Sequence, residues 1–397
     1  MAIINRIADF HAEMTQWRHH IHAHPETAFA EHQTAEFVAE RLASFGISVE
    51  RGIAGTGVVG TLRGLAPGRR AIALRADMDA LHIDEQNAFA HASQQSGRMH
   101  ACGHDGHTAM LLGAAKHLAE TRNFAGTIHF IFQPAEENEG GARVMIEEGV
   151  FDKYPVDAVY GMHNWPELPV GRFAIQPGPM MAAFDIFEIT ITGRGGHAAM
   201  PHLAVDPIVV AAQVVNGLQT IASRNTHPLE NAVVSVTQIH GGDTWNVIPE
   251  TVVLRGTTRS FSPDVRDQME PRIRRIADGA CRSYGADMEL RYERRYPLTL
   301  NAAVETKFAA TAAAAIVGEG NVRRDMLPSM GAEDFAFFLE KKPGAYIWIG
   351  NGTAEGGGML HSPHYDFNDA ILPLGASYWV RLAEAVLARD SASARSL

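Results

Sequence analysis

The chain contains 397 residues, which is more than one ordinary hydrophobic core accommodates and favours two domains. Hydrophobic residues make up 46% and charged residues 20% of the sequence, so a sizeable core can be buried. The net charge of -11 and the absence of a Lys/Arg block argue against nucleic acid or an anionic membrane as a partner.

The sequence also bears on the cellular compartment. No apolar run approaches the roughly 18 residues that a membrane-spanning helix needs. The N-terminal residues lack the basic start and the long apolar stretch of a signal peptide. The two cysteines, Cys102 and Cys281, do not imply a disulfide framework. We therefore expect a cytoplasmic protein without membrane association.

The N-terminal third alternates the patterns of strands and helices. Strands are predicted over 56–64, 70–77, 125–133 and 156–164, and helices over 34–46, 107–121 and 140–151. Strands separated by helices predict an α/β sheet that is covered on both faces. A helix over 304–318, a strand over 344–350 and a helix over 376–389 return to this pattern, and the polar stretch 389–397 is expected to be frayed.

The middle of the chain has the order β-α-β-β-α-β, which is the ferredoxin-like pattern. The strands are predicted over 184–193, 231–241, 251–261 and 287–296, and the helices over 204–221 and 262–285. Ser262 and Pro263 are a typical helix start, whereas Pro271 predicts a kink or a later start. We therefore expect a domain formed by 1–182 plus 296–397, interrupted by a domain over 183–295.

One short segment, "MHACGHDGHTAM" (99–110), concentrates potential metal ligands. Cys102, His104, Asp105 and His107 lie within it. A lone cysteine is often a small buried hydrophobe, and a histidine at a helix start is often only packed. We expect Cys102 and His104 to be ligands, and Asp105 and His107 to support ligands from behind.

Polar clusters also follow four predicted strands. Asp77 and Asp79 end one strand, Glu136 and Glu137 follow a second, His163 follows a third, and His361 lies in the loop after a fourth. Ligands of open α/β sheets bind beyond the carboxyl ends of the strands. These clusters should therefore meet at one edge of the sheet.

Together these residues supply Cys, His, Glu, His and His, a donor set that suits zinc, manganese, nickel or cobalt. Five protein ligands exceed a four-coordinate site that also holds a water. Two divalent metal ions sharing a bridging ligand fit better, and the Cys102 thiolate is the natural bridge. Within the Glu136–Glu137 pair, one carboxylate can bind metal while its neighbour acts as a general base toward a metal-bound water.

Ten motifs carry a resemblance to a known family. They are "WRHHIHAHPE", "ALRADMDAL", "MHACGHDGH", "FQPAEE", "GMHN", "GRGGHAAMPH", "NVIPE", "RGTTRSF", "GAEDFAFF" and "LHSPHYDFND", in order over about residues 17–369. In these motifs the chain resembles the M20 metallopeptidase family, specifically its amidohydrolase subfamily, which includes hippurate hydrolases, N-acyl-amino-acid amidohydrolases and auxin-conjugate hydrolases.

The resemblance implies a role for each site residue. The implied metal ligands are Cys102, His104, Glu137, His163 and His361. Glu136 is implied as the general base and Asp79 as an acid that orients the metal site. The implied architecture is a zinc-peptidase-like catalytic domain with a mixed sheet, interrupted by a ferredoxin-like lid or dimerisation domain.

The resemblance also implies the reaction and the partners. The expected reaction is metal-dependent hydrolysis of an N-acyl amino acid to a carboxylic acid and a free amino acid. His197 and Asn246 are implied to reach the carbonyl oxygen or the carboxylate of the substrate. The expected assembly is a homodimer or a dimer of dimers, with His197 often supplied by the partner subunit in this family.

Two positions depart from the family pattern. The wider family reads His-x-Asp where this chain has Asp77-Met-Asp79, which leaves Asp77 without an assigned role. The subfamily usually has proline where this chain has His82, which bears on the mouth of the site.

Other functions compete with this one. A dipeptidase or aminoacylase-type peptidase could use the same metal site. A cysteine hydrolase with Cys102 as nucleophile explains the nearby histidines, but not the glutamate pair, His163 and His361. A binding protein without catalysis is disfavoured by the intact Glu136 and Glu137. The sequence leaves the acyl group, the amino acid and the physiological metal open.

Overall fold

A computed structural model describes residues 1–353 and 358–389, so most of the polar stretch 389–397 lies outside the described residues. The chain divides into two compact units. Unit 1 comprises Met1–Met180, Leu300–Leu327 and Asp334–Leu397, and unit 2 comprises Met181–Thr299 and Pro328–Glu333. Residues 296–299 and 328–333 therefore belong to unit 2, which the sequence pattern did not predict.

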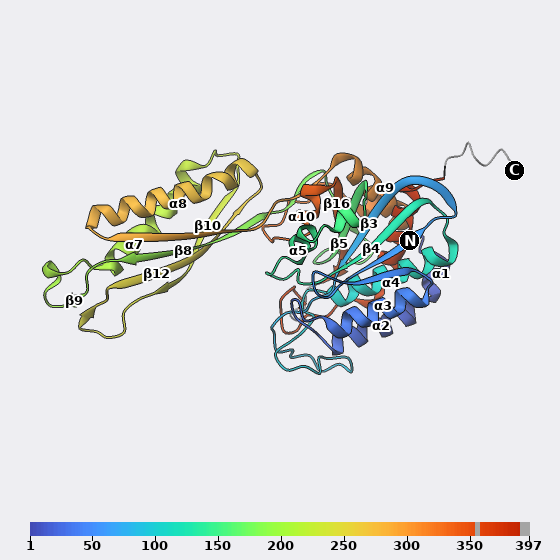
Figure 1. The fold of residues 1–397 in the computed structure, drawn as a ribbon, viewed down its shortest axis with the longest axis horizontal. Coiled ribbons are helices and arrows are strands. Elements are labelled where there is room, and N and C mark those ends of the chain that lie inside the picture. The colour runs from blue at the N-terminus through green and yellow to red at the C-terminus, as the bar shows by residue number, and fades with distance from the viewer. Residues whose placement is uncertain (354–357, 390–397) are drawn as a thin grey trace. The chain divides into compact units, whose positions relative to one another are not determined.

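Unit 1 is built around one large sheet (Figure 1). Its strands are β1 (Ser48–Ile53), β2 (Gly57–Arg63), β3 (Ala66–Asp77), β4 (Ala125–Gln133), β5 (Ala158–Pro166), β6 (Phe173–Ala174), β15 (Val322–Arg323) and β16 (Gly344–Gly352). Its helices are α1 (Asn5–Asp9), α2 (His11–Ala23), α3 (His32–Ser44), α4 (His104–Thr121), α5 (Gly141–Glu147), α6 (Val150–Lys153), α9 (Ala303–Val317), α10 (Ala336–Lys341) and α11 (Leu372–Val386).

The strand order in this sheet is β1-β2-β4-β3-β5-β16-β6-β15. The four central strands β4, β3, β5 and β16 are mutually parallel, whereas β1 and β2 are antiparallel additions at one edge. The sheet is therefore mixed. Because the central strands are parallel, their carboxyl ends lie along a single edge.

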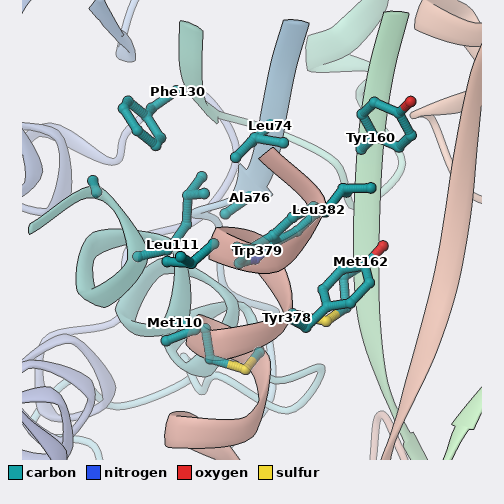
Figure 2. Packing of buried hydrophobic residues seen from close by; sticks show 14 of the residues in the cluster. Leu74, Ala76, Met110, Leu111, Phe130, Tyr160, Met162, Tyr378, Trp379 and Leu382 are labelled. Carbon is teal, nitrogen blue, oxygen red and sulfur yellow. The ribbon is translucent and has the colours of Figure 1, made fainter. Parts of the chain in front are cut away.

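The core of unit 1 follows from the alternation of side chains along the strands. Leu74 and Ala76 of β3 and Tyr160 and Met162 of β5 point to the same face, where α4 and α11 cover them. Figure 2 shows these side chains packed around Trp379 and its neighbours on α11. Full burial of a large apolar side chain contributes about 1.5–3 kcal/mol, so this layer stabilises the strand order that positions the polar edge.

Unit 2 contains a four-stranded antiparallel sheet with two helices on one face (Figure 1). The elements are β8 (Ala183–Thr192), α7 (Pro207–Leu218), β10 (Ala232–His240), β12 (Thr251–Ser260), α8 (Pro263–Tyr284) and β13 (Asp287–Tyr296), and the strand order is β10-β12-β8-β13. This is the ferredoxin-like topology. Two further short pairs complete the fold, β9 (Gly196–His197) with β11 (Val247–Ile248), and β7 (Gly178–Met181) with β14 (Thr299–Asn301).

The fold class predicted from the sequence is confirmed, with a mixed α/β sheet and an inserted domain. Helix α8 begins at Pro263, where Ser262 caps it, and it continues through Pro271, so the predicted later start is wrong. Helices α1 and α2 and strand β1 were not predicted. Within the described residues, no helix combines the length and the apolar character needed to cross a membrane.

Candidate metal centre

The candidate centre lies at the carboxyl edge of the parallel strands of unit 1. Asp77 is the last residue of β3, and Glu136 and Glu137 follow β4. His361 comes from the chain after β16, and His104 is the first residue of α4. His163 lies inside β5, which extends three residues beyond it to Pro166, rather than after the strand as the sequence suggested.

The structure brings the five expected metal ligands together. The ligand atoms of Cys102, His104 and His163 lie within 4.8 Å of one another. The same limit holds for Cys102, Glu137 and His361. Cys102 therefore belongs to both groups, which is the position that a ligand shared between two ions would occupy.

The His104 ring uses one of its two nitrogens for hydrogen bonding. Its Nδ1 lies 2.8 Å from the backbone oxygen of Asp79 and 3.3 Å from Asp79 Oδ1, so Nδ1–H is the donor. Its Nε2 is buried and has no hydrogen-bond partner within the described residues. Burial lowers the pKa of His104, but the charge of Asp77 and the hydrogen bond to Asp79 outweigh it and raise the pKa to about 10. Nε2 lies 3.7 Å from Asp77 Oδ2, too far for a hydrogen bond. A buried nitrogen without a hydrogen bond costs free energy, which a metal ion at Nε2 would remove.

His163 presents its other ring nitrogen to Cys102. Nδ1 lies 2.6 Å from the backbone oxygen of Asn164, and Nε2 lies 3.4 Å from Cys102 Sγ. Burial, together with the nearby His107, lowers the pKa of His163 well below its usual range. The ring is therefore neutral, which is the protonation state of a metal ligand.

His361 and Glu137 form the other side of the centre. His361 Nε2 lies 3.2 Å from Glu137 Oε1, and this contact raises the pKa of His361. The backbone of His361 has a positive φ of 63°, and its N–H donates to the backbone oxygen of Ala101 at 2.8 Å. This bond ties the chain after β16 to the segment that carries Cys102.

Asp79 links the two sides from behind. Its Oδ2 accepts a hydrogen bond from the Glu137 backbone N–H at 2.9 Å, while its other oxygens face His104 Nδ1. Glu136 is buried, and its Oε1 lies 3.3 Å from the backbone nitrogen of Asp334. The two neighbouring glutamates thus have different surroundings.

The donor chemistry fits a pair of borderline divalent ions. Burial, reinforced by the charges of Glu137 and Glu136, raises the pKa of the Cys102 thiol well above its usual value. A thiol in this environment stays protonated unless a cation stabilises the thiolate. Thiolate, imidazole and carboxylate donors are those that zinc and similar ions prefer.

A network of side chains behind the centre was not predicted from the sequence. This network gives Asp77 a structural role. Asp77 Oδ1 lies 2.6 Å from His107 Nδ1, and Asp77 Oδ2 accepts from Arg75 at 2.6 Å. His107 Nε2 accepts from the backbone N–H of Asn164 at 3.0 Å. Both nitrogens of His107 are thereby engaged, as expected for a supporting residue. Alternation along β3 was the available signal, because Arg75 and Asp77 share one face of the strand.

Asp334 belongs to the same network. It is fully buried and accepts hydrogen bonds from Arg75 and Gln133 side chains at 3.0 and 2.8 Å, and from the backbone N–H of Ala142 at 2.9 Å. These contacts secure the loop that carries Glu136 and Glu137.

Asp105 points away from the donors. Its Oδ2 lies 2.8 Å from His22 Nδ1 and 3.2 Å from an Arg18 guanidinium nitrogen. Adjacent residues of a helix face directions about 100° apart, which explains why His104 and Asp105 serve different networks.

The two residues expected to contact substrate lie together in unit 2. His197 of β9 pairs with Val247 of β11, and the Ala198 N–H donates to the Asn246 backbone oxygen at 3.0 Å. His197 Nδ1 accepts from the Ala199 N–H at 3.1 Å, so Nε2 carries the proton in the neutral ring and can donate. Both side chains are exposed.

Comparisons with known proteins identify the family of this chain. A family model described as peptidase family M20/M25/M40 matches residues 73–385. N-acetylcysteine deacetylase of Bacillus subtilis (strain 168) is 41% identical over 381 residues, covering 95% of this chain and 98% of that protein. Hippurate hydrolase of Campylobacter jejuni subsp. jejuni is 40% identical over 383 residues, covering 96% of this chain and 99% of that protein.

A solved structure is similar as well. The Bacillus subtilis YXEP protein, described as a dinuclear metal binding peptidase from the M20 family, has a TM-score of 0.83 and 37% identity, covering 96% of this chain and 99% of that one. Both its fold and the two curated relatives agree with the resemblance seen in the motifs. The chain therefore belongs to peptidase family M20/M25/M40, within its amidohydrolase subfamily, and is a metal-binding hydrolase.

Proposed function

We propose that this chain hydrolyses the amide bond of N-acyl amino acids, releasing a carboxylic acid and a free amino acid, with two divalent metal ions per subunit. The observation that carries the proposal is the pair of donor groups that share Cys102, with Glu136 beside them. Relatives named for deacetylation of N-acetylcysteine and for hydrolysis of hippurate support this substrate class.

The metal ions would be held by Cys102, His104, Glu137, His163 and His361. Such ions polarise a carbonyl and lower the pKa of a water molecule. Glu136 would take the proton of the attacking water and deliver it to the nitrogen of the departing amino acid, because it adjoins Glu137 in sequence and remains outside the ligand set. Asp79 would keep His104 and Glu137 in position through the hydrogen bonds described above.

His197 and Asn246 would bind the substrate's carbonyl oxygen or carboxylate as hydrogen-bond donors. A donor aimed at a developing oxyanion contributes about 2.7–4 kcal/mol in other hydrolases. We further propose a homodimer or a dimer of dimers, and light scattering of the purified protein measures the mass directly.

Glu136→Gln tests the proposal. The amide keeps the size of the side chain but removes the proton acceptor, so kcat should fall about 10²- to 10⁴-fold. The assay uses metal-reconstituted enzyme and a panel of acetyl, benzoyl, indoleacetyl and longer acyl amino acids, with metal content measured in parallel. Glu139→Gln is the matched control, because Glu139 is an exposed acid of the same loop. Undiminished turnover by Glu136→Gln with metal bound would contradict the mechanism.

Two other activities are separated by the same experiments. The similar solved structure is described as a peptidase, so dipeptides belong in the panel, and a preference for dipeptides over N-acyl amino acids would favour the peptidase alternative. A hydrolase using Cys102 as its nucleophile would retain activity after exhaustive chelation. The raised pKa of the Cys102 thiol disfavours that role in the absence of metal.

A further inference from the structure

A second buried carboxylate lies behind the loop that carries Glu136, outside the donor set. Glu31 precedes α3 and is fully buried. Its chain segment runs beside the one that carries Asp79, because Thr27 and Ala80 form a parallel β-bridge. None of the roles assigned above uses Glu31.

Three donors converge on this carboxylate. Glu31 Oε1 accepts hydrogen bonds from the backbone N–H of Ala135 at 2.9 Å and of Phe29 at 3.1 Å. Glu31 Oε2 accepts from Thr56 Oγ1 at 2.6 Å. The bond to Ala135 joins residues far apart in the sequence, so it fixes the loop after β4 to the segment before α3.

Ala135 is the residue at which this loop needs support. It is fully buried, it has a φ of 54°, and it directly precedes Glu136. The left-handed region costs a residue with a Cβ roughly 1–2 kcal/mol. Strained conformations of this kind persist where the surroundings hold them. The Ala135 backbone oxygen is held as well, by the N–H of Gly141 at 2.8 Å.

We propose that Glu31 is a positioning residue for Glu136, acting through its hydrogen bond to the strained Ala135 amide. The inference rests on the proposed function in one respect, namely that a displaced Glu136 lowers kcat. The geometric part, that Glu31 determines the backbone at Ala135, stands independently of the substrate.

Two substitutions distinguish the effect of side-chain length at Glu31 from the effect of its charge. Glu31→Asp keeps the charge but shortens the side chain by one methylene, so its carboxylate cannot contact both Thr56 and Ala135. Glu31→Gln keeps the length, because its Oε1 can accept from Ala135 and its Nε2–H can donate to Thr56. Burial and the charge of Asp79 raise the pKa of Glu31 to about 7, so glutamine replaces a carboxyl that is already partly protonated at neutral pH.

The readout is kcat per metal-loaded site, with KM measured alongside. Glu31→Asp should lower kcat about 10²-fold, the effect of misplacing a reacting group by about 1 Å, with KM within about twofold of wild type. Glu31→Gln should stay within about threefold of the wild-type kcat. Crystal structures of the wild type and Glu31→Asp should show a shifted Ala135–Glu136 backbone in the variant.

Glu26→Asp is the matched control. Glu26 is also buried and lies on the same segment, but its carboxylate accepts from the backbone N–H groups of Gln33 and Thr34, in the first turn of α3. This variant should lose thermal stability and keep the wild-type kcat per metal-loaded site.

Three outcomes would overturn the inference: a Glu31→Asp variant that loses only folded or metal-loaded protein, a Glu31→Gln variant as impaired as Glu31→Asp, or an unmoved Ala135 in the crystal. Loss of the proposed function looks different, because wild-type enzyme would then fail to hydrolyse the substrate panel while the backbone shift at Ala135 persisted.

Discussion

At the residue scale, two of the candidate histidine ligands each use one ring nitrogen for a hydrogen bond. That bond determines which nitrogen remains available to a metal ion. His104 donates Nδ1–H to Asp79, which leaves Nε2 without a hydrogen bond within the described residues and available to a metal ion. His163 donates Nδ1–H to the Asn164 carbonyl and directs Nε2 toward Cys102. Hydrogen-bonded ring nitrogens of this kind fix the tautomer and the orientation of metal-binding histidines.

Asp79→Asn tests the role of the carboxylate behind His104. Loss of this charge should weaken metal affinity or activity about 10- to 100-fold, as loss of a residue that orients a ligand does. A competition titration with a chromogenic chelator measures the affinity. Asp84→Asn is the control, because Asp84 is exposed and contacts Ser96 and Gly97 instead. Equal affinities for both variants would exclude Asp79 from orienting the site.

At the element scale, the first turn of α4 joins two helices and a loop. His104 faces the other candidate metal ligands, while Asp105 contacts Arg18 and His22 of α2. Arg18 is fully buried and also pairs with Asp366 and Asp369, in the chain that follows His361. Three carboxylates from two segments of chain therefore surround one guanidinium. Removing one partner of such a buried pair costs about 3–5 kcal/mol, because the remaining charge is left unpaired.

The contact between His22 of α2 and Asp105 of α4 depends on pH. Burial lowers the pKa of His22, but its hydrogen bonds and charge interactions with Asp105 and Glu85 outweigh burial and raise the pKa to about 9. A histidine in an unfolded chain titrates near 6.5. The folded state binds the proton more tightly, so this stabilisation is complete below about pH 6.5 and is lost as the pH rises through 9.

We therefore expect His22→Gln to reduce the loss of unfolding free energy that accompanies a rise to alkaline pH. Urea unfolding of metal-free protein at pH 6 and pH 9.5 should show that the wild type loses about 3 kcal/mol more than the variant between these values. His24→Gln is the control, because the His24 ring is hydrogen-bonded to the backbone oxygen of His20 and, within the described residues, to no carboxylate. A wild-type curve parallel to that of His22→Gln would contradict the prediction.

At the scale of the whole molecule, the candidate ligands converge only when the sheet of unit 1 is formed. The candidate ligands belong to different segments that meet at the edge of the sheet, and unfolding would separate them. They include Cys102, Glu137, His163 and His361. Binding of metal to the folded state alone therefore stabilises unit 1. Unit 2 has its own core of apolar side chains from its sheet and from α7 and α8.

Metal removal should consequently act on one unit. A metal concentration 100 times the dissociation constant stabilises by about 2.7 kcal/mol, so exhaustive chelation should lower the Tm of unit 1 by about 5–10 °C. Differential scanning calorimetry should show the transition of unit 2 unmoved. A Cys102→Ala/His163→Ala double variant should not respond to chelation, and an equal response would argue against these ligands.

Much of the fold was accessible from the sequence because its signals are local. The alternation of β8, the capping of α8 by Ser262 and Pro263, and the apolar runs of β4 and β5 depend on neighbouring residues, and the elements formed where these patterns predicted them. Helices α1 and α2 were missed. Helix α2 buries Arg18 and His22 along with its apolar residues, so its buried face does not read as apolar in the sequence.

What the sequence by itself determined was the inventory of elements and the family motifs, because both are written in short stretches of chain. Only the tertiary structure decided the strand order β4-β3-β5-β16, which places Asp77, Glu137, His163 and His361 along one edge. It also decided that Asp105 serves Arg18 and His22, that Asp77 holds His107 and Arg75, and that Glu31 reaches Ala135. The physical reason is that these contacts join residues distant in sequence, where no local pattern records which side chains will meet.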